Sequence, residues 1–187
     1  MRIIGGRFRG QFINAPAGFT ARPTTDRVRE NIFNILQSRL EFDGLRVLDL
    51  FAGSGALGFE AISRGAGYCL FIEQSKKVLP VLHQSIQKFS LDDEVDVLGI
   101  DCRQLGAIGE TNPFDLVFAD PPYSKGLGER AASMVAKDGW LAPGALLVLE
   151  EDKGSLPDEI THFDMIDRRF YGQTGIGLFK FEGSDPK

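Results

Sequence analysis

Cysteine and histidine are scarce in this sequence of 187 residues, which has 2 of each. Two cysteines cannot form the disulfide framework of a small secreted scaffold. Cys69 and Cys102 form no C-x-x-C pair, and with only His83 and His162 beside them no structural zinc site is expected. A chain of this length buries about two thirds of its unfolded surface. It therefore needs neither disulfides nor metal to fold as one domain. The small number of cysteines is consistent with a reducing compartment.

Long apolar runs are missing as well. No stretch approaches the roughly 20 residues that a membrane-spanning helix needs. The segment Met1–Gly6 lacks the apolar core and cleavage site of a signal peptide. We therefore expect a soluble, unprocessed, cytoplasmic protein that is a monomer and has no membrane partner.

The sequence also lacks an excess of positive charge, since 21 Lys and Arg stand against 26 Asp and Glu and give a net charge of −5. Taken alone, this average argues against a nucleic-acid partner. However, residues 1–30 contain six Arg and two acids, a net of +4, and the remaining residues carry −9. The cations that could meet phosphate are concentrated at one end of the sequence.

From residue 45 onward, short apolar runs alternate with helix-like stretches, which is the pattern of βαβ units in a parallel sheet. We predict an α/β fold with a mostly parallel, seven-stranded sheet. The last two strands should form an antiparallel hairpin, because Gly172–Thr174 is too short for a crossover helix. The predicted strands are Arg46–Phe51, Tyr68–Glu73, Glu94–Ile100, Phe114–Ala119, Ala145–Glu151, Phe163–Tyr171 and Gly175–Glu182, and the helices between them are Ala56–Arg64, Ser75–Phe89 and Gly126–Asp138.

The first 40 residues are organised differently. Arg2–Asn14 alternates around glycines like a small β-hairpin, and a loop rich in Pro and Gly leads to an amphipathic helix over Asp26–Leu40. Arg29 is expected to lie off the apolar stripe of that helix. The predicted domains are an N-terminal extension of hairpin, loop and helix (1–40), a main domain (41–183) and a polar tail (184–187).

The most informative segment is Asp49-Leu50-Phe51-Ala52-Gly53-Ser54-Gly55, in which a strand enters a glycine-rich turn. With Gly58 it matches G-x-G-x-x-G, a pattern that both dinucleotides and S-adenosylmethionine could use. Asp49 distinguishes them, because a carboxylate here would repel a pyrophosphate but attract the cationic sulfonium and amino groups of S-adenosylmethionine. A plain turn capped by Asp49 would leave the three glycines unexplained.

Two further acids follow predicted strands. Glu73 is placed to accept hydrogen bonds from both ribose hydroxyls, and Asp101 from an adenine amino group. Glu73 could instead cap the next helix, and Asp101 could be a turn residue. Ligands of open α/β sheets bind beyond the carboxyl ends of the strands, where both acids and Asp49 should lie.

The fourth predicted strand ends in Asp120-Pro121-Pro122-Tyr123. The two prolines make this loop rigid and leave its carbonyls free to accept hydrogen bonds. An exocyclic amine on a base is a poor nucleophile because its lone pair is delocalised. The Asp120 carboxylate and Pro121 carbonyl could accept from both N–H groups and aim the lone pair, while Tyr123 could stack on the base. The alternative is a purely structural role, in which Asp120-Pro121 forms a turn and Tyr123 packs against the protein.

Together these motifs resemble the class I, Rossmann-like S-adenosylmethionine-dependent methyltransferases, and Asp120–Tyr123 resembles the [DNS]-P-P-[YFW] signature of their amino-methylating branch. The segments Arg2–Gly10, Arg22–Glu30 and Asp49–Gly55 are similar to the RsmD-type 16S rRNA guanine-N2 methyltransferases. This resemblance implies methyl transfer from S-adenosylmethionine to the N2 amino group of a guanine in 16S rRNA, with S-adenosylhomocysteine as product and no metal. It also implies 16S rRNA or the assembling small ribosomal subunit as the partner.

The resemblance further implies roles for individual residues. The cofactor would contact Asp49, Ala52, Gly53 and Gly55 at its methionine end, Glu73 at the ribose, and Asp101 and Cys102 at the adenine. The guanine amino group would be held by Asp120, Pro121 and Tyr123. RNA binding would involve Arg2, Arg7, Arg9, Arg22, Thr24 and Arg29. One departure concerns the family's usual Tyr-Gly-Asp-Thr-Arg, which here reads Tyr171-Gly172-Gln173-Thr174-Gly175.

Three alternatives stay open. Asp-Pro-Pro-Tyr indicates an amine acceptor, which could also be adenine N6 of a nucleic acid or a side-chain amide of a protein. An NAD-dependent oxidoreductase would use the glycine pattern but not Asp49. A non-catalytic RNA-binding module would have no need of Asp49, Glu73 and Asp120 together.

Overall fold

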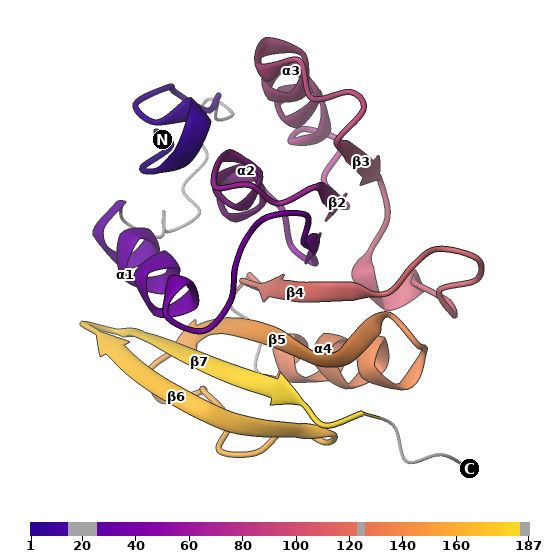
Figure 1. Ribbon diagram of the computed structural model, residues 1–187. Coiled ribbons are helices and arrows are strands. Elements are labelled where there is room, and N and C mark those ends of the chain that lie inside the picture. Colours follow the sequence, from indigo (N-terminus) through magenta and orange to yellow (C-terminus); the bar gives the residue numbers. More distant parts are fainter. Residues whose placement is uncertain (15–25, 123–125, 184–187) are drawn as a thin grey trace.

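The computed structural model describes residues 1–14, 26–122 and 126–183. Its strands form one sheet in the order β3-β2-β1-β4-β5-β7-β6, and β7 is the strand of this sheet that runs against the others (Figure 1). The strands are β1 (Arg46–Asp49), β2 (Tyr68–Ile72), β3 (Val95–Leu98), β4 (Phe114–Ala119), β5 (Leu141–Asp152), β6 (Phe163–Tyr171) and β7 (Thr174–Phe181). The helices are α1 (Asp26–Gln37), α2 (Ala56–Ser63), α3 (Leu79–Phe89) and α4 (Leu127–Lys137), with short 3₁₀ turns η1 (Gly6–Phe8) and η2 (Cys102–Gln104).

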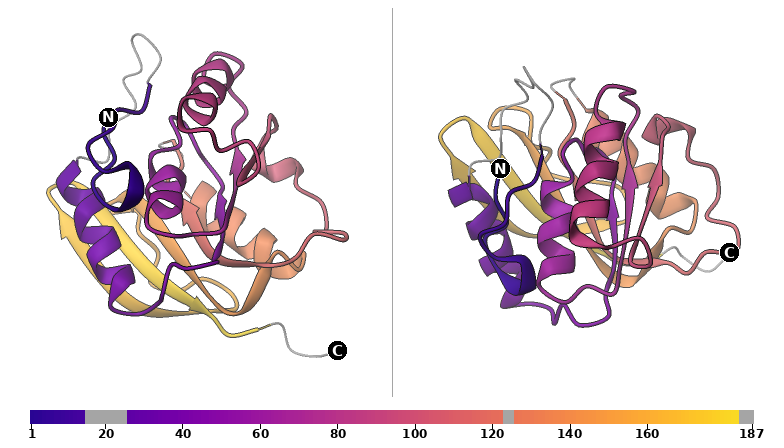
Figure 2. Two further views of the ribbon diagram at one scale, coloured as in Figure 1. Left: turned by 45° about the horizontal axis from the view of Figure 1, so that its top comes forward. Right: turned by 90° about the horizontal axis from the view of Figure 1, so that it is seen from above.

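The sheet is covered on both faces. Alternate residues of each strand point to opposite sides, so that Val47 of β1 packs in one core cluster and Leu48 in the other. The first cluster contains the apolar faces of α1, α2 and α3, and the second contains that of α4. Figures 1 and 2 show α1, α2 and α3 together on one side of the sheet, with α4 on the other.

The chain reverses its direction of travel across the sheet between β1 and β4. From β1 it proceeds outward to β2 and β3, then returns to place β4 on the other side of β1. Asp49, the last residue of β1, pairs with Phe71 of β2 and with Phe118 of β4. This arrangement creates a topological switch point at the carboxyl ends of β1 and β4, which is where α/β sheets bind ligands.

The predicted fold class is confirmed, including the antiparallel C-terminal hairpin of β6 and β7. Several predicted boundaries differ from the observed ones by one to three residues, and the starts of two elements differ by four. Helix α3 begins at Leu79 rather than Ser75, because Pro80 has no N–H to donate and suits the first turn of a helix. Strand β5 begins at Leu141, where it already pairs with Phe114 before a register shift.

The N-terminal residues pack directly on the sheet-covering helices. Arg2 and Phe12 form one antiparallel bridge, and η1 makes the turn between them, so this hairpin has no regular strands. The side chains of Ile3 and Ile13 join the core cluster of α1, α2 and α3. In the ranges that the structure describes, no helix is both long and apolar enough to cross a membrane.

Candidate functional site

Asp49 is a buried carboxylate at the switch point. It is 2% exposed, and it accepts hydrogen bonds from the backbone N–H groups of Gly58, at 3.3 Å, and Phe51. Burial is the main cause that raises the pKa of this carboxyl to about 7, and the charge of Glu73 acts in the same direction. No cation of the described residues contributes to this pKa. The site therefore presents a carboxylate whose charge is not offset by these residues, which fits a cationic ligand.

The glycines of the turn are required by its geometry. Gly53 and Gly55 have φ values of 53° and 79°, a region that side chains with a Cβ rarely adopt. A Cβ on Gly55 would lie 2.6 Å from the ring of Phe59, and one on Gly58 would lie 2.3 Å from that of Phe71. Gly58 therefore serves helix-to-strand packing, while Gly53 and Gly55 shape the turn that a ligand could approach.

Glu73 ties the glycine turn to the end of β2. Its Oε2 accepts from the N–H of Gly53 at 2.8 Å and its Oε1 from that of Ser75 at 2.6 Å. Ser75 lies in the segment before α3, and the N-cap of that helix is Val78, so Glu73 fixes the approach to the helix and does not cap it. Each carboxylate oxygen has a further lone pair, so these bonds leave acceptors for ribose hydroxyls. Ala52, whose N–H donates to the carbonyl of Ile72 at 3.0 Å, completes this junction.

Asp101 and Cys102 follow β3 and begin η2. Asp101 accepts from the backbone N–H of Arg103 at 2.9 Å and forms an ion pair with its guanidinium, which lowers the pKa of the Asp101 carboxyl. Cys102 is 4% exposed and packs in the core cluster of α4, and burial raises the pKa of its thiol to about 11. Asp101 is therefore held charged at the strand end, and Cys102 is mainly a core residue.

The Asp120–Pro122 segment begins directly after β4. Phe118 of β4 pairs with Asp49, and the N–H of Leu50 donates to the Phe118 carbonyl at 3.0 Å, so Asp120 and Asp49 end neighbouring strands. Pro121 is buried and Pro122 exposed. The predicted site residues Tyr123, Arg22 and Thr24 lie outside the described residues.

The N-terminal arginines differ in their accessibility. Arg9 is exposed, Arg2 pairs with Asp26 at 3.1 Å, and Arg7 pairs with Glu94. Arg29 is fully buried, and its Nη2 donates to the Arg2 carbonyl at 2.6 Å and to Asp26 at 2.9 Å. The prediction that Arg29 contacts RNA is therefore wrong for its side chain, because the N-terminal segment covers the flank of α1 that the helical pattern left polar.

Sequence reasoning missed three buried acids, which are Glu60 of α2 and the neighbouring Glu150 and Glu151 of β5. Glu60 of α2, fully buried, accepts from the N–H groups of Ile4 at 2.7 Å and Gly5 at 2.8 Å, and from Arg64 Nε at 2.8 Å. The only sequence feature that indicates a buried Glu60 is its position inside an otherwise apolar helix. Glu151, near the end of β5, is 7% exposed, and its place in a run of three acids hid it.

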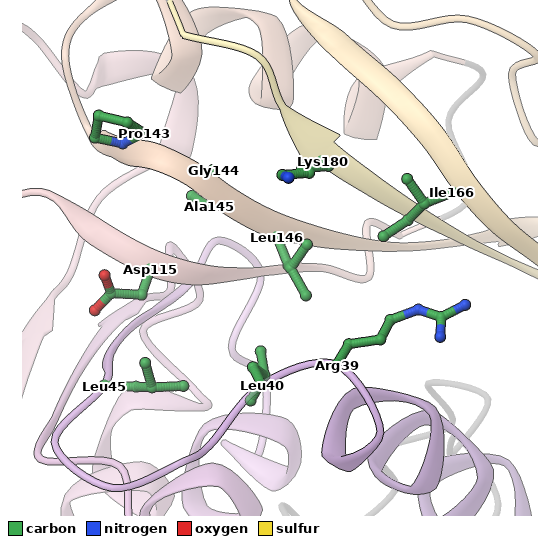
Figure 3. Close-up of a pocket in the computed structure, with 10 residues that line it drawn as sticks. All are labelled: Arg39, Leu40, Leu45, Asp115, Pro143, Gly144, Ala145, Leu146, Ile166 and Lys180. Carbon is green, nitrogen blue, oxygen red and sulfur yellow. The ribbon is translucent and has the colours of Figure 1, made fainter.

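A pocket of about 540 Å³ lies at the other end of the sheet, near the amino ends of the parallel strands (Figure 3). Its lining combines apolar residues such as Leu45 and Leu146 with Asp115, Arg39 and Lys180. Asp115 already accepts the N–H of Arg46 at 2.9 Å. This pocket is separate from the glycine turn and does not belong to the candidate site. Within the described parts of the chain, no group of three His, Cys, Asp or Glu side chains could hold a metal ion.

Comparison with known proteins finds relatives over nearly the whole chain. The model of a family described as conserved hypothetical protein 95 matches residues 1–180. The chain is 35% identical over 183 residues to ribosomal RNA small subunit methyltransferase D of Escherichia coli (strain K12), covering 97% of this chain and 90% of that protein. It is 37% identical over 155 residues to the Haemophilus influenzae protein of the same name, covering 82% and 79%. The solved structure of yhhF from Escherichia coli superimposes with a TM-score of 0.84 at 34% identity, covering 98% of this chain and 99% of that chain.

Proposed function

We propose that this chain, which belongs to the conserved hypothetical protein 95 family, is an S-adenosylmethionine-dependent methyltransferase acting on the N2 amino group of a guanine in small-subunit rRNA. The observation that carries the proposal is the pair of acids, Asp49 and Asp120, on neighbouring strands at the switch point. One has the charge and burial to hold a cationic methyl donor, and the other begins a loop suited to an amine. The names of the relatives supply the class of substrate.

The cofactor pocket would be formed by the glycine turn and the acids around it. S-adenosylmethionine, when bound, supplies the electrophilic methyl group. Asp49 would attract the positive charge of the methionine end, and the backbone at Gly53 and Gly55 would allow close approach. Glu73, fixed by its bond to Gly53, would accept the ribose hydroxyls, and Asp101 would lie beside the adenine.

The acceptor amine would be held by Asp120 and Pro121. The Asp120 carboxylate and the Pro121 carbonyl would each accept one N–H, which localises the nitrogen lone pair and points it toward the methyl group. The nitrogen becomes cationic as it gains the methyl group, and Asp120 would then take the proton that it releases. No metal is needed, because orientation and proton acceptance come from these two groups.

The N-terminal segment would contact the RNA through Arg2, Arg7 and Arg9, and the protein would act as a cytoplasmic monomer on 16S rRNA or on the assembling subunit. Phosphate contacts require local cations rather than a basic protein overall. The segregated charge of residues 1–30 supports this assignment.

The test is transfer of a tritiated methyl group from S-adenosylmethionine to undermethylated 16S rRNA and, separately, to partly assembled small subunits, followed by nucleoside analysis. We expect label in N2-methylguanosine. Label in N6-methyladenosine would change the acceptor base. Label in protein alone, or none with either substrate, would overturn the rRNA proposal. Comparison of the two substrates decides between free rRNA and the particle.

A further inference from the structure

Strand β5 extends beyond the end of β4, the parallel strand with which it pairs. Ala119, the last residue of β4, pairs with Leu149, whereas β5 continues to Asp152. The ladder with β4 cannot continue in the ordinary way, because Pro121 and Pro122 have no N–H to donate. The last residues of β5 therefore lie alongside the Asp120–Pro122 loop without being part of a regular ladder with it.

Glu151 connects this part of β5 to the start of α4. Its buried carboxylate accepts the backbone N–H of Gly128, the second residue of that helix. Amide groups in the first turn of a helix have no partner within the helix, so an acceptor supplied by another element fixes the helix end. Glu151 is in this sense a cap donated by the sheet.

Gly128 is tightly enclosed at this junction. A Cβ placed on it would lie 2.4 Å from Leu149 Cδ1, 3.2 Å from Glu151 Oε1 and 3.3 Å from Pro121 Cγ. The same small space thus contains the end of β5, the start of α4 and the first proline of the amine-binding loop. A displacement of Gly128 would therefore change its packing against Pro121.

The surroundings of Glu151 are poor in compensating charge. Its partner across the sheet on β7 is Gly175, and the side chains nearest to a Cβ there are Leu156 and Phe170, both at 3.3 Å. Burial, with a smaller contribution from the charge of Asp152, raises the pKa of the Glu151 carboxyl to about 7. A carboxyl group in such a place costs free energy of folding, since among the described residues one backbone hydrogen bond and no cation lowers that pKa.

We propose that Glu151 is a positioning residue for methyl transfer, which holds the start of α4 against β5 and thereby fixes Pro121 and Asp120 where the acceptor amine must be bound. The inference rests on the proposed function of Asp120 and Pro121. Glu151 itself touches neither the cofactor nor the base. Its effect should therefore be on turnover and not on cofactor affinity.

The test compares two substitutions that separate reach from charge. Glu151→Gln keeps the length of the side chain and an oxygen acceptor for Gly128, whereas Glu151→Asp keeps the charge but is one methylene shorter. We expect Glu151→Asp to lower kcat by about 10-fold, with the KM for RNA and the Kd for S-adenosylmethionine changed less than about 2-fold. Glu151→Gln should retain kcat within about 3-fold, and the exposed Glu159→Gln serves as the matched control.

Two measurements keep the outcome decisive. Amide hydrogen exchange at Gly128, measured without substrate, should be faster in Glu151→Asp and nearly unchanged in Glu151→Gln. Gly128→Ala should lower kcat in the same way, and its effect should not add to that of Glu151→Asp. Equal kcat in both Glu151 variants and the wild type would overturn the proposal. Unchanged amide exchange at Gly128 in Glu151→Asp would overturn it as well. Lack of methyl transfer by the wild type would instead count against the proposed function.

Discussion

Asp49 combines a structural cost with a proposed function. The pKa of its carboxyl is about 7 in the folded protein, against an ordinary value near 3.8. The native state therefore binds a proton more tightly than the unfolded state, and its stability falls as the pH rises from about 4 to 7. Above pH 7 the charge is buried with no cation of the described residues to offset it, and the difference between the two pKa values corresponds to about 4 kcal/mol at most. A cationic ligand would relieve this cost.

Replacement of Asp49 by Asn should therefore separate stability from binding. We expect Asp49→Asn to raise the free energy of unfolding at pH 8 by about 1–3 kcal/mol and to have little effect at pH 4, where the wild-type carboxyl is already protonated. Affinity for S-adenosylmethionine at pH 8 should fall by about 10-fold or more. Urea unfolding at both pH values and titration calorimetry test this. Unchanged affinity would contradict the charge argument.

Asp120 should behave in the opposite manner, because its proposed role is confined to the acceptor amine. We expect Asp120→Ala to bind S-adenosylmethionine almost as well as the wild type but to lower turnover by about 100-fold or more. Single-turnover methyl transfer together with calorimetry measures the two effects separately. A loss of cofactor affinity as large as the loss of rate would show that Asp120 serves the cofactor and not the acceptor.

Sequence pattern identifies a site residue when the residues beside it in the chain already indicate its position in the fold. Asp49 and Asp120 end apolar strands, and the glycines between Asp49 and Gly58 mark a turn, so their positions at one sheet edge follow from the α/β pattern. Glu60 and Arg29 depend on docking of the N-terminal segment, whose contacts with Glu60 span more than fifty residues. No helical or strand periodicity carries that information, and Arg29 was misassigned for this reason.

Among the elements, the η1 turn is fastened to α2 by close backbone approach. Gly6 has a φ of 71°, and a Cβ on it would lie 1.7 Å from the Ser63 carbonyl oxygen. The N–H of Phe8 donates to Ser63 Oγ at 2.9 Å, and that hydroxyl donates to the Gly5 carbonyl at 2.6 Å. The turn therefore has one position on α2, which sets where the arginines of the N-terminal segment are presented.

Gly6→Ala should displace this turn. We expect a loss of about 2–4 kcal/mol in stability, or local undocking of residues 1–14, because the backbone strain and the clash with Ser63 add together. Gly10→Ala is the control, since Gly10 also has a positive φ, 84°, but has open space around its Cβ position, and should cost about 1 kcal/mol. Thermal unfolding compares the two. Equal losses would show that strain, and not docking, dominates at Gly6.

Considered as a whole, the molecule carries its charge unevenly, with a net of +4 in residues 1–30 and −9 in the remainder. An acidic protein repels RNA over most of its surface, so binding must be confined to the cationic part. Docking of residues 1–14 on α1 and α2 places this segment on the face of the sheet opposite to α4 (Figure 2). We therefore expect RNA to bind on this face.

The salt dependence of RNA binding tests whether RNA binds on the face that carries the N-terminal segment. Each phosphate contact contributes about 0.7–0.9 to the slope of log K against log salt concentration, so Arg7→Ala with Arg9→Ala should reduce the slope by about 1.5. The control is Arg130→Ala with Lys137→Ala, which removes the same charge from exposed positions on α4. Binding of undermethylated 16S rRNA between about 50 and 200 mM KCl measures both slopes. If the two double variants lose the same slope, only net charge matters; if the α4 pair loses more, the RNA lies on the α4 face.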